Sequence, residues 1–168
     1  MSRQFDRDDP LLVITTGGTI DKAYFDALSE YQVGESQVGR LLQAARVTRP
    51  YEIVELFRKD SLDLTDSDRE LIAGHIQASR AMRIVITHGT DTMTDTAAAL
   101  ENLADRTIVL VGALAPARFS ESDAAFNLGM AFAVAQVAPS GVYLTMNGTV
   151  FRADEVVKDR ARGEFVRR

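Results

Sequence analysis

The chain has 168 residues, of which 46% are hydrophobic and 26% are charged, with a formal net charge of −5. This length suits one compact α/β domain with a hydrophobic core, and the composition is that of a folded globular protein. The acidic balance argues against a surface for nucleic acid or an anionic membrane, and the absence of cysteine excludes disulfides and thiolate metal sites.

The first ten residues are charged and polar and contain no apolar signal segment. No apolar run elsewhere is long enough to cross a bilayer, and no repeat or low-complexity stretch divides the chain. We therefore expect a cytoplasmic protein with one domain over residues 1–168, and no membrane partner. With only His75 and His88 available, we also expect no metal site and no cofactor.

Short runs rich in β-branched residues alternate with helical patterns along the chain. These runs are Leu11–Thr15, Glu52–Phe57, Arg83–Thr87, Thr107–Val111 and Gly141–Thr145. Such alternation is typical of βαβ units, and runs that are apolar throughout, such as Ile84–Ile86, indicate strands covered on both faces. The pattern predicts a three-layer, doubly wound α/β fold with a mostly parallel sheet of the Rossmann or flavodoxin-like kind.

Helix starts are marked by three segments that resemble capping boxes with Asp in place of Glu. They begin at Thr65, Thr92 and Ser120. After Thr92, apolar residues recur at helical spacing, namely Met93, Ala97, Leu100 and Ala104. The run Ala124–Ala135 is apolar on nearly every side and predicts a buried helix. Asn147-Gly148 between two apolar runs predicts an antiparallel hairpin at the C-terminal end of the sheet.

The residues just after the predicted strands are the candidates for a site, because ligands bind beyond the carboxyl ends of parallel strands. They are Thr16–Thr19, Lys59–Ser61, His88–Thr92 and Gly112–Ala113. The glycine turns among them leave backbone N–H groups free for an anion or a developing oxyanion, although each is also compatible with ordinary turn chemistry. No Walker loop or dinucleotide fingerprint is present, so no motif supports nucleotide binding.

A threonine hydroxyl in these turns needs a neighbour that removes its proton before it can attack. Tyr24, Lys158 and Asp91 are the candidates, and Thr90, Lys158 and Asp91 could form one relay. Local sequence alone favours a solvated Lys158 in a charged tail. The segment from Asp21 to Ser36 has no clean period, and its length suits a mobile flap over a site.

The two histidines do not require a catalytic interpretation. We interpret His88 as a hydrogen-bonded core histidine at a strand end, and His75 lies in the middle of a predicted helix. A Ser61, His88, Asp91 triad ranks below the threonine scheme because no Gly-x-Ser-x-Gly elbow is present.

Two segments taken together, Ile14–Ile20 and Ile86–Met93, resemble the signature motifs of the bacterial-type L-asparaginase family (asparaginase/glutaminase). The resemblance continues through Asp60–Leu64, Val111–Pro116 and Met146–Lys158, so it covers almost the whole chain in order. Family members usually continue into a smaller C-terminal domain, whereas this chain stops soon after Lys158. The chain therefore resembles the short single-domain form, with residues 1–168 as an N-terminal-type catalytic domain.

The resemblance implies hydrolysis of L-asparagine to L-aspartate and ammonia through a threonine nucleophile and an acyl-enzyme. It implies that Thr19 attacks the amide and that Tyr24 acts from the flap, with Tyr31 as the alternative. Thr90, Asp91 and Lys158 would form the supporting relay. The implied substrate-binding positions are Gly18, Ser61, Gly89, Thr90, Asp91 and Ala113. A homo-oligomer, either a dimer or a tetramer, is expected by analogy with the family.

Two other functions stay open at this point. A non-catalytic amino-acid-binding or subunit module is compatible with the short chain, and a nucleotide-binding domain is suggested only by the glycine turns. The C-terminal domain of family members supplies an acidic group to the substrate ammonium, so the choice between asparagine and glutamine also stays open here. Leu62 stands where a polar residue is common in the family.

Overall fold

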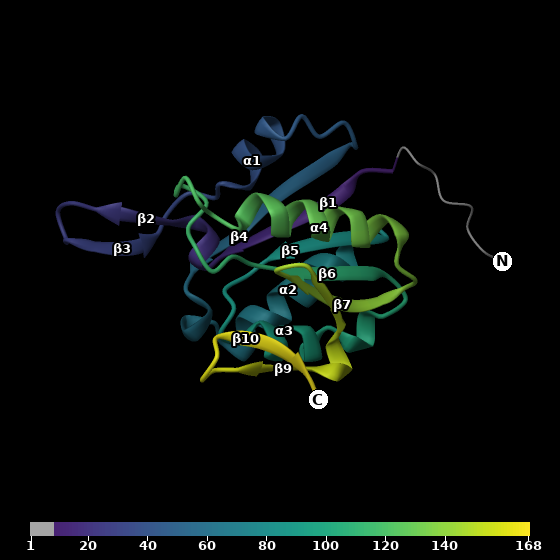
Figure 1. The fold of residues 1–168 in the computed structure, drawn as a ribbon. Helices are drawn as coiled ribbons and strands as arrows, with labels where there is room; N and C mark the ends of the chain where they lie inside the picture. Colours follow the sequence, from purple (N-terminus) through teal and green to yellow (C-terminus); the bar gives the residue numbers. More distant parts are fainter. Residues whose placement is uncertain (1–8) are drawn as a thin grey trace.

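The computed structural model describes residues 9–168, and a six-stranded sheet runs through the middle of this part of the chain (Figure 1). The strand order is β4-β1-β5-β6-β7-β8, in which β8 alone pairs in the antiparallel sense. The strands are β1 (Leu11–Gly17), β4 (Tyr51–Lys59), β5 (Arg83–Thr87), β6 (Thr107–Val111), β7 (Gly141–Met146) and β8 (Thr149–Arg152). The predicted mostly parallel sheet with a C-terminal antiparallel hairpin is confirmed.

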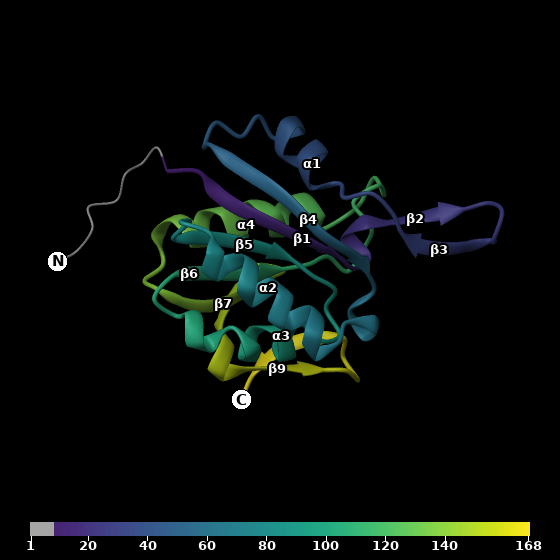
Figure 2. The same ribbon diagram turned by 180° about the vertical axis from the view of Figure 1, so that it is seen from behind.

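Helices cover both faces of this sheet (Figures 1 and 2). One face is covered by α1 (Val38–Ala44) and α4 (Ala124–Val137), and the other by α2 (Asp66–Ala78) and α3 (Met93–Ala99). None of the helices in residues 9–168 is both long and apolar enough to cross a membrane.

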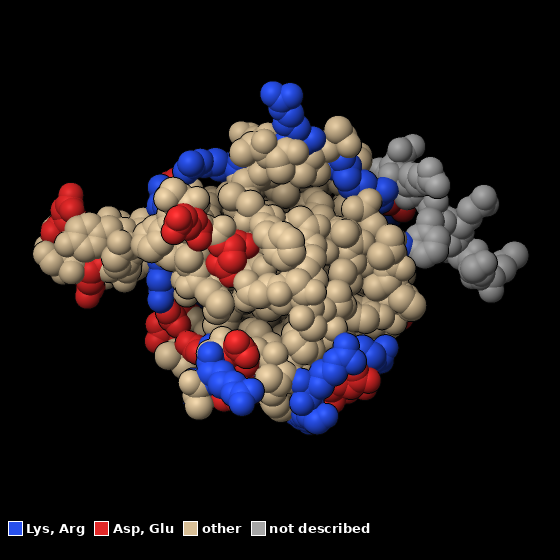
Figure 3. Space-filling view, viewed as in Figure 1, with Lys and Arg blue, Asp and Glu red and all other residues tan. Residues whose placement is uncertain are grey.

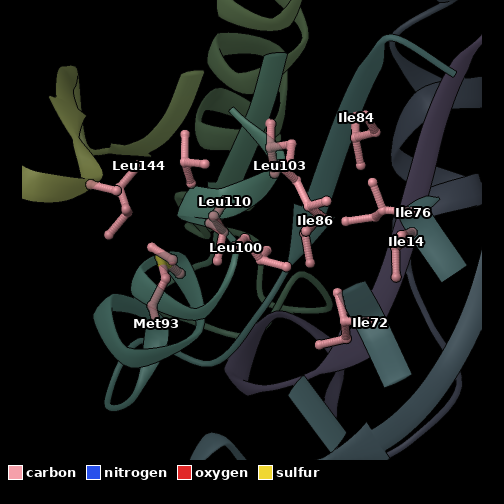
Figure 4. Packing of buried hydrophobic residues seen from close by; sticks show 14 of the residues in the cluster. Ile14, Ile72, Ile76, Ile84, Ile86, Met93, Leu100, Leu103, Leu110 and Leu144 are labelled. Atoms are coloured by element: carbon pink, nitrogen blue, oxygen red, sulfur yellow. The ribbon is translucent and has the colours of Figure 1, made fainter. Parts of the chain in front are cut away.

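Adjacent residues of β1 belong to two different cores because side chains alternate between the faces of a strand. Ile14 packs with Ile72 of α2 and Ile86 of β5 on one face of the sheet (Figure 4). Val13 belongs to the cluster that contains Leu42 of α1 on the other face. The predicted three-layer, doubly wound arrangement is therefore confirmed.

The order of the parallel strands creates a switch point between β1 and β5. Numbered along the chain, the five parallel strands stand in the order 2-1-3-4-5, which is the flavodoxin-like order. From β1 the chain goes outward in one direction to β4 and then crosses to β5 on the other side of β1. The turns that follow β1 and β5 therefore meet at the carboxyl ends of these strands, the place of the ligand crevice in folds of this kind.

The connection from β6 through α4 to β7 has the opposite hand to the others. Both α3 and α4 connect strands in the same direction across the sheet, yet they lie on opposite faces (Figures 1 and 2). Because nearly all such crossovers are right-handed, α4 would be expected beside α3. The chain instead passes over the carboxyl edge of the sheet between residues 112 and 123, which brings this loop to the switch point.

Only the first of the three predicted capping boxes is present. The Thr65 hydroxyl accepts a hydrogen bond from the Asp68 N–H, and the Asp68 carboxylate accepts from the Thr65 N–H. Thr92 precedes α3 as predicted, but its hydroxyl donates to the Ser61 carbonyl at 2.7 Å and caps nothing. A contact between distant segments has replaced the local cap. The helix after it ends at Ala99, short of the predicted helical position Ala104.

The prediction that α4 is buried on nearly every side is wrong for its outer surface. Ala131 and Phe132 are buried against the sheet, whereas Phe126 is 63% and Val137 is 82% exposed. α4 contains no charged residue, and the middle of the face over it is largely uncharged in Figure 3. Its predicted cap at Ser120 is also wrong, because the helix begins only after Asp123. An apolar pattern on all sides could not tell which side faces the sheet.

Two antiparallel hairpins lie outside the main sheet. β2 (Lys22–Phe25) and β3 (Glu30–Val33) project from the carboxyl edge and form most of the segment without a clear period (Figure 1). β9 (Val156–Asp159) and β10 (Glu164–Arg167) pack on the face covered by α2 and α3, where Val156 joins the core. Short 3-10 turns occur at Thr19–Asp21, Ser61–Asp63, Glu101–Leu103 and Ala153–Glu155.

Candidate active site

The turns that follow β1 and β5 touch each other at two glycines. Gly18 has φ of 88°, and a Cβ atom built on it would lie 2.4 Å from the Gly89 nitrogen. A Cβ atom on Gly89 would in turn lie 2.7 Å from the Ser61 hydroxyl oxygen. No side chain fits at either position, so these glycines bring the turns after β1, β4 and β5 into direct backbone contact. Sequence reasoning placed all three turns at one crevice, and their contact agrees with that prediction.

The loop after β6 closes the same crevice from a second side. Ala113 is 2% exposed and forms a small buried cluster with Ile20, the residue after Thr19. The Ala117 N–H donates to the Ile20 carbonyl at 3.0 Å. The loop is therefore fixed against the turn that carries Thr19.

Lys158 reaches the crevice from β9, 67 and 68 residues away in sequence from its partners. Its ammonium nitrogen lies 2.8 Å from the Thr90 hydroxyl oxygen and 2.5 Å from the Asp91 carboxylate. The Lys158 side chain is only 11% exposed, whereas that of Asp91 is 42% exposed. The interpretation of Lys158 as a solvated tail residue is therefore wrong. The structure brings together the three side chains of the predicted relay, and their catalytic roles stay predictions.

Both candidate tyrosines lie on the β2–β3 hairpin as cross-strand partners. Tyr24 pairs with Tyr31, and the centroids of their rings are 5.3 Å apart. Tyr31 also packs edge-on against Phe119, and each tyrosine is 51% exposed. Within residues 9–168, no hydrogen bond joins either hydroxyl to Thr19, which is itself only partly buried. The geometry does not choose between the two tyrosines.

His88 is a buried core histidine, as the sequence indicated. Its Nδ1 lies 2.6 Å from the Gly89 carbonyl oxygen and its Nε2 lies 2.8 Å from the Thr96 hydroxyl. Burial, above all, lowers the pKa of His88 to about 4, so the ring is neutral at pH 7. Both nitrogens are engaged away from Ser61, which argues against the Ser61, His88, Asp91 triad.

The comparison with known protein families agrees with this geometry. Residues 10–164 match the family model described as "Asparaginase, N-terminal". The chain belongs to the asparaginase family. It is 33% identical to L-asparaginase 2 of Escherichia coli and 30% identical to a glutaminase-asparaginase of Acinetobacter glutaminasificans, in each case over 88% of this chain.

A solved asparaginase has the same fold. The thermostable L-asparaginase from Thermococcus kodakarensis matches 95% of this chain with a TM-score of 0.80 and 27% identity. The match covers 51% of that protein, and the two sequence relatives are covered to 46% and 49%. This asparaginase-family chain therefore spans about half the length of the relatives it matches.

An acidic side chain that sequence reasoning missed holds the loop after β6. The Asp123 carboxylate accepts hydrogen bonds from the N–H groups of Leu114 and Ala115, each at 3.0 Å. It also accepts from the side-chain amides of Asn127 at 2.9 Å and Asn147 at 2.8 Å. Partial burial alone would raise the pKa of Asp123, but these hydrogen bonds together lower it below its ordinary value. Asp123 belongs to the segment that begins at Ser120, which we interpreted from sequence as a helix cap.

A buried acid in this asparaginase-family chain lies two residues after Thr19. Asp21 is 1% exposed at the base of the β2–β3 hairpin, where it accepts from the Gln37 N–H at 2.8 Å. Burial raises the pKa of Asp21 to about 6, and the nearby Glu55 carboxylate adds to this effect. The Gln37 hydrogen bond and the Arg118 guanidinium oppose it.

Ser61 and its neighbour Leu62 differ in their exposure to solvent. Ser61 is 1% exposed, whereas the neighbouring Leu62 is 65% exposed. The part of the chain that the structure describes contains no group of three or more His, Asp or Glu side chains that could hold a metal ion.

Proposed function

We propose that this chain hydrolyses L-asparagine to L-aspartate and ammonia. The observation that carries the proposal is the contact of Lys158 with both Thr90 and Asp91 beside the turn of Thr19. Membership of the asparaginase family supports the substrate class.

In the first step, the Thr19 oxygen attacks the side-chain amide carbon of asparagine. The new C–O bond forms, the amide nitrogen gains a proton, and the C–N bond breaks to release ammonia. The attack leaves negative charge on the amide oxygen, which the backbone N–H groups of Thr90 and Ala113 are proposed to stabilise. Tyr24 or Tyr31 would take the proton from Thr19 and pass its own hydroxyl proton to the leaving nitrogen when the hairpin closes over the substrate.

In the second step, water attacks the acyl-enzyme ester, the C–O bond to Thr19 breaks, a proton of the water returns to the Thr19 oxygen, and aspartate leaves. Lys158 can only donate, so the Thr90 oxygen accepts from it and the Thr90 hydrogen is free to point toward a reacting group. Asp91 fixes the Lys158 ammonium from its other side. Ser61 and Asp91 are proposed to bind the α-carboxylate and the α-ammonium of the substrate.

An ammonia-release assay with L-asparagine tests this mechanism. We expect Thr19→Ala and Thr90→Ala to lose activity while their circular dichroism spectra stay those of the wild type. Full activity in either variant would contradict the mechanism. Comparison of Tyr24→Phe with Tyr31→Phe decides which tyrosine acts, and the same assay with L-glutamine measures the selectivity.

The non-catalytic alternative predicts a different result from the same protein. Tight binding of asparagine or aspartate without ammonia release at any pH would favour an amino-acid-binding or subunit module. A one-domain organisation of residues 1–168, a homo-oligomer and a cytoplasmic location belong to the same proposal. Limited proteolysis, light scattering and cell fractionation respectively test these three points.

A further inference from the structure

A chain of buried hydrogen bonds connects α2 to the turn that carries Thr90. The Arg69 Nε atom lies 3.1 Å from the Thr96 hydroxyl of α3, and that hydroxyl lies 2.8 Å from His88 Nε2. His88 Nδ1 completes the chain at 2.6 Å from the Gly89 carbonyl oxygen. Arg69 is 9% exposed, and Thr96 and His88 are fully buried.

The chemistry of the Arg69 guanidinium and of the Gly89 carbonyl fixes the direction of every hydrogen bond between them. A guanidinium can only donate, so the Thr96 oxygen accepts from Arg69. A carbonyl oxygen can only accept, so the hydrogen of the neutral His88 ring is on Nδ1. Nε2 then carries a lone pair, and the Thr96 hydroxyl donates to it. Burial and the nearby Arg69 charge both keep His88 neutral.

Gly89 needs such an external restraint more than any other residue of the turn. A glycine has the widest choice of backbone conformations, and Gly89 has no side chain with which to anchor itself. Its backbone also touches Gly18 and Ser61, so a rotation of this peptide would move the residues on either side of it. The next two residues, Thr90 and Asp91, are those that contact Lys158.

We propose that His88 is a positioning residue, whose Nδ1–H holds the Gly89 carbonyl and thereby sets the Gly89–Asp91 turn. Thr96 and Arg69 keep the ring in the tautomer that can do so. The catalytic consequence rests on the proposed function, whereas the restraint on the turn does not. His88 needs no contact with the substrate for this role.

Two substitutions at the same position separate the hydrogen bond from the volume of the ring. In His88→Asn the side-chain amide can take the place of Nδ1–H and donate to the Gly89 carbonyl. In His88→Leu a side chain of similar size has no donor, so the two variants share the loss of ring packing. We expect His88→Asn to retain kcat within about fivefold and His88→Leu to lose about thirtyfold, with a smaller change in KM.

Hydrogen exchange of the Gly89, Thr90 and Asp91 amides tests the restraint without any assay of turnover. Exchange should be faster in His88→Leu than in His88→Asn, and ¹⁵N NMR of the wild type should find the His88 hydrogen on Nδ1. Asp66→Asn is the matched control, because its exposed carboxylate pairs with Arg69 but lies outside the chain of hydrogen bonds. It should leave the tautomer and the exchange rates unchanged.

The outcomes separate the two claims. Equal exchange in both His88 variants, or a hydrogen on Nε2 in the wild type, would overturn the positioning role even in an active enzyme. Faster exchange in His88→Leu supports that role, and this holds even for a protein that releases no ammonia. A wild type without ammonia release would overturn the proposed function alone.

Discussion

The two ends of the parallel strands differ sharply in their chemistry. At the carboxyl end, glycine turns touch and Lys158 contacts Thr90 and Asp91. At the amino end, Arg106, which precedes β6, donates to the backbone carbonyls of Ile76, Ser79 and Ala81. These carbonyls belong to the C-terminal end of α2 and the loop after it, so Arg106 caps that helix end.

The contacts of the proposed relay and the contacts that close a helix end therefore lie at opposite ends of the same strands. Substitutions of Lys158, Asp123 and the touching glycines should lower turnover, whereas substitution of Arg106 should lower mainly the free energy of unfolding.

Lys158→Met should remove the relay and lower kcat by about a thousandfold, because Thr90 and Asp91 lose their shared donor. Its folding should change little, since Asp91 is partly exposed and can be solvated by water. Steady-state kinetics and chemical denaturation measure the two effects. The control is Arg152→Met, which breaks the exposed pair with Asp154 and should leave kcat unchanged. A Lys158→Met protein that keeps a tenth of the wild-type kcat would contradict the relay.

Gly18→Ala should separate the touching turns and lower kcat/KM by about a hundredfold, because its Cβ would overlap the Gly89 backbone. We also expect a loss of about 1–3 kcal/mol in the free energy of unfolding. Gly74→Ala is the matched control in α2, where a Cβ meets nothing within 4 Å. It should stabilise the protein by about 0.5–1 kcal/mol without a change in turnover. Unaltered kinetics in Gly18→Ala would show that the contact of the turns is dispensable.

Asp123→Asn should loosen the loop after β6 and lower kcat/KM by about tenfold, because an amide group cannot accept all the hydrogen bonds that the carboxylate accepts. Arg106→Met, at the amino end of the same strand, should cost about 1–3 kcal/mol of stability and leave kcat/KM within about twofold. Kinetics and urea titrations of both variants make the comparison. Equal losses of activity in the two variants would contradict the separation between the two ends.

Asp21→Asn should act mainly on the pH dependence of stability. The folded-state pKa of Asp21 is about 6, above its ordinary 3.8, so its contribution to stability is fully present below pH 3.8 and is lost as the pH rises through 6. The variant should therefore gain about 2–3 kcal/mol relative to the wild type between pH 4 and pH 8. Urea titrations over this range measure the gain, and parallel wild-type and variant curves would contradict it.

The contribution of His88 to the free energy of unfolding changes with pH in the opposite direction. Its folded-state pKa of about 4 lies below the ordinary 6.5, so its contribution is present above pH 6.5 and is lost as the pH falls toward 4. With Asp21 replaced, this loss on acidification should be steeper than in the wild type.

The fold could be predicted from sequence where local pattern and tertiary packing agree. The apolar runs of β5 and β6 became buried central strands, and Thr65 caps α2 through contacts within four residues. The hand of the α4 crossover could not be predicted, because the apolar pattern of that helix does not record which face of the sheet it covers. The β2–β3 hairpin was missed because its residues are mostly exposed and carry no alternating pattern.

The candidate site also contains some residues that could be predicted from sequence and others that could not. The glycines at positions 18 and 89 could be identified from sequence, because turns at strand ends have a local signature. The place of Lys158 could not be derived locally, since its partners lie 67 and 68 residues away, and the local sequence favoured a solvated side chain. Asp123 was interpreted as a helix cap because its partners Leu114 and Ala115 are in a loop whose path the sequence does not reveal.

The proposed mechanism requires that Thr19 attacks the amide of asparagine at the switch point between β1 and β5. Acid-quenched mass spectrometry of the protein mixed with isotopically labelled L-asparagine tests this claim most directly. The account predicts a labelled aspartyl ester on the peptide that contains Thr19, absent in Thr19→Ala. Labelling of Thr90 instead, or ammonia release from Thr19→Ala, would contradict it.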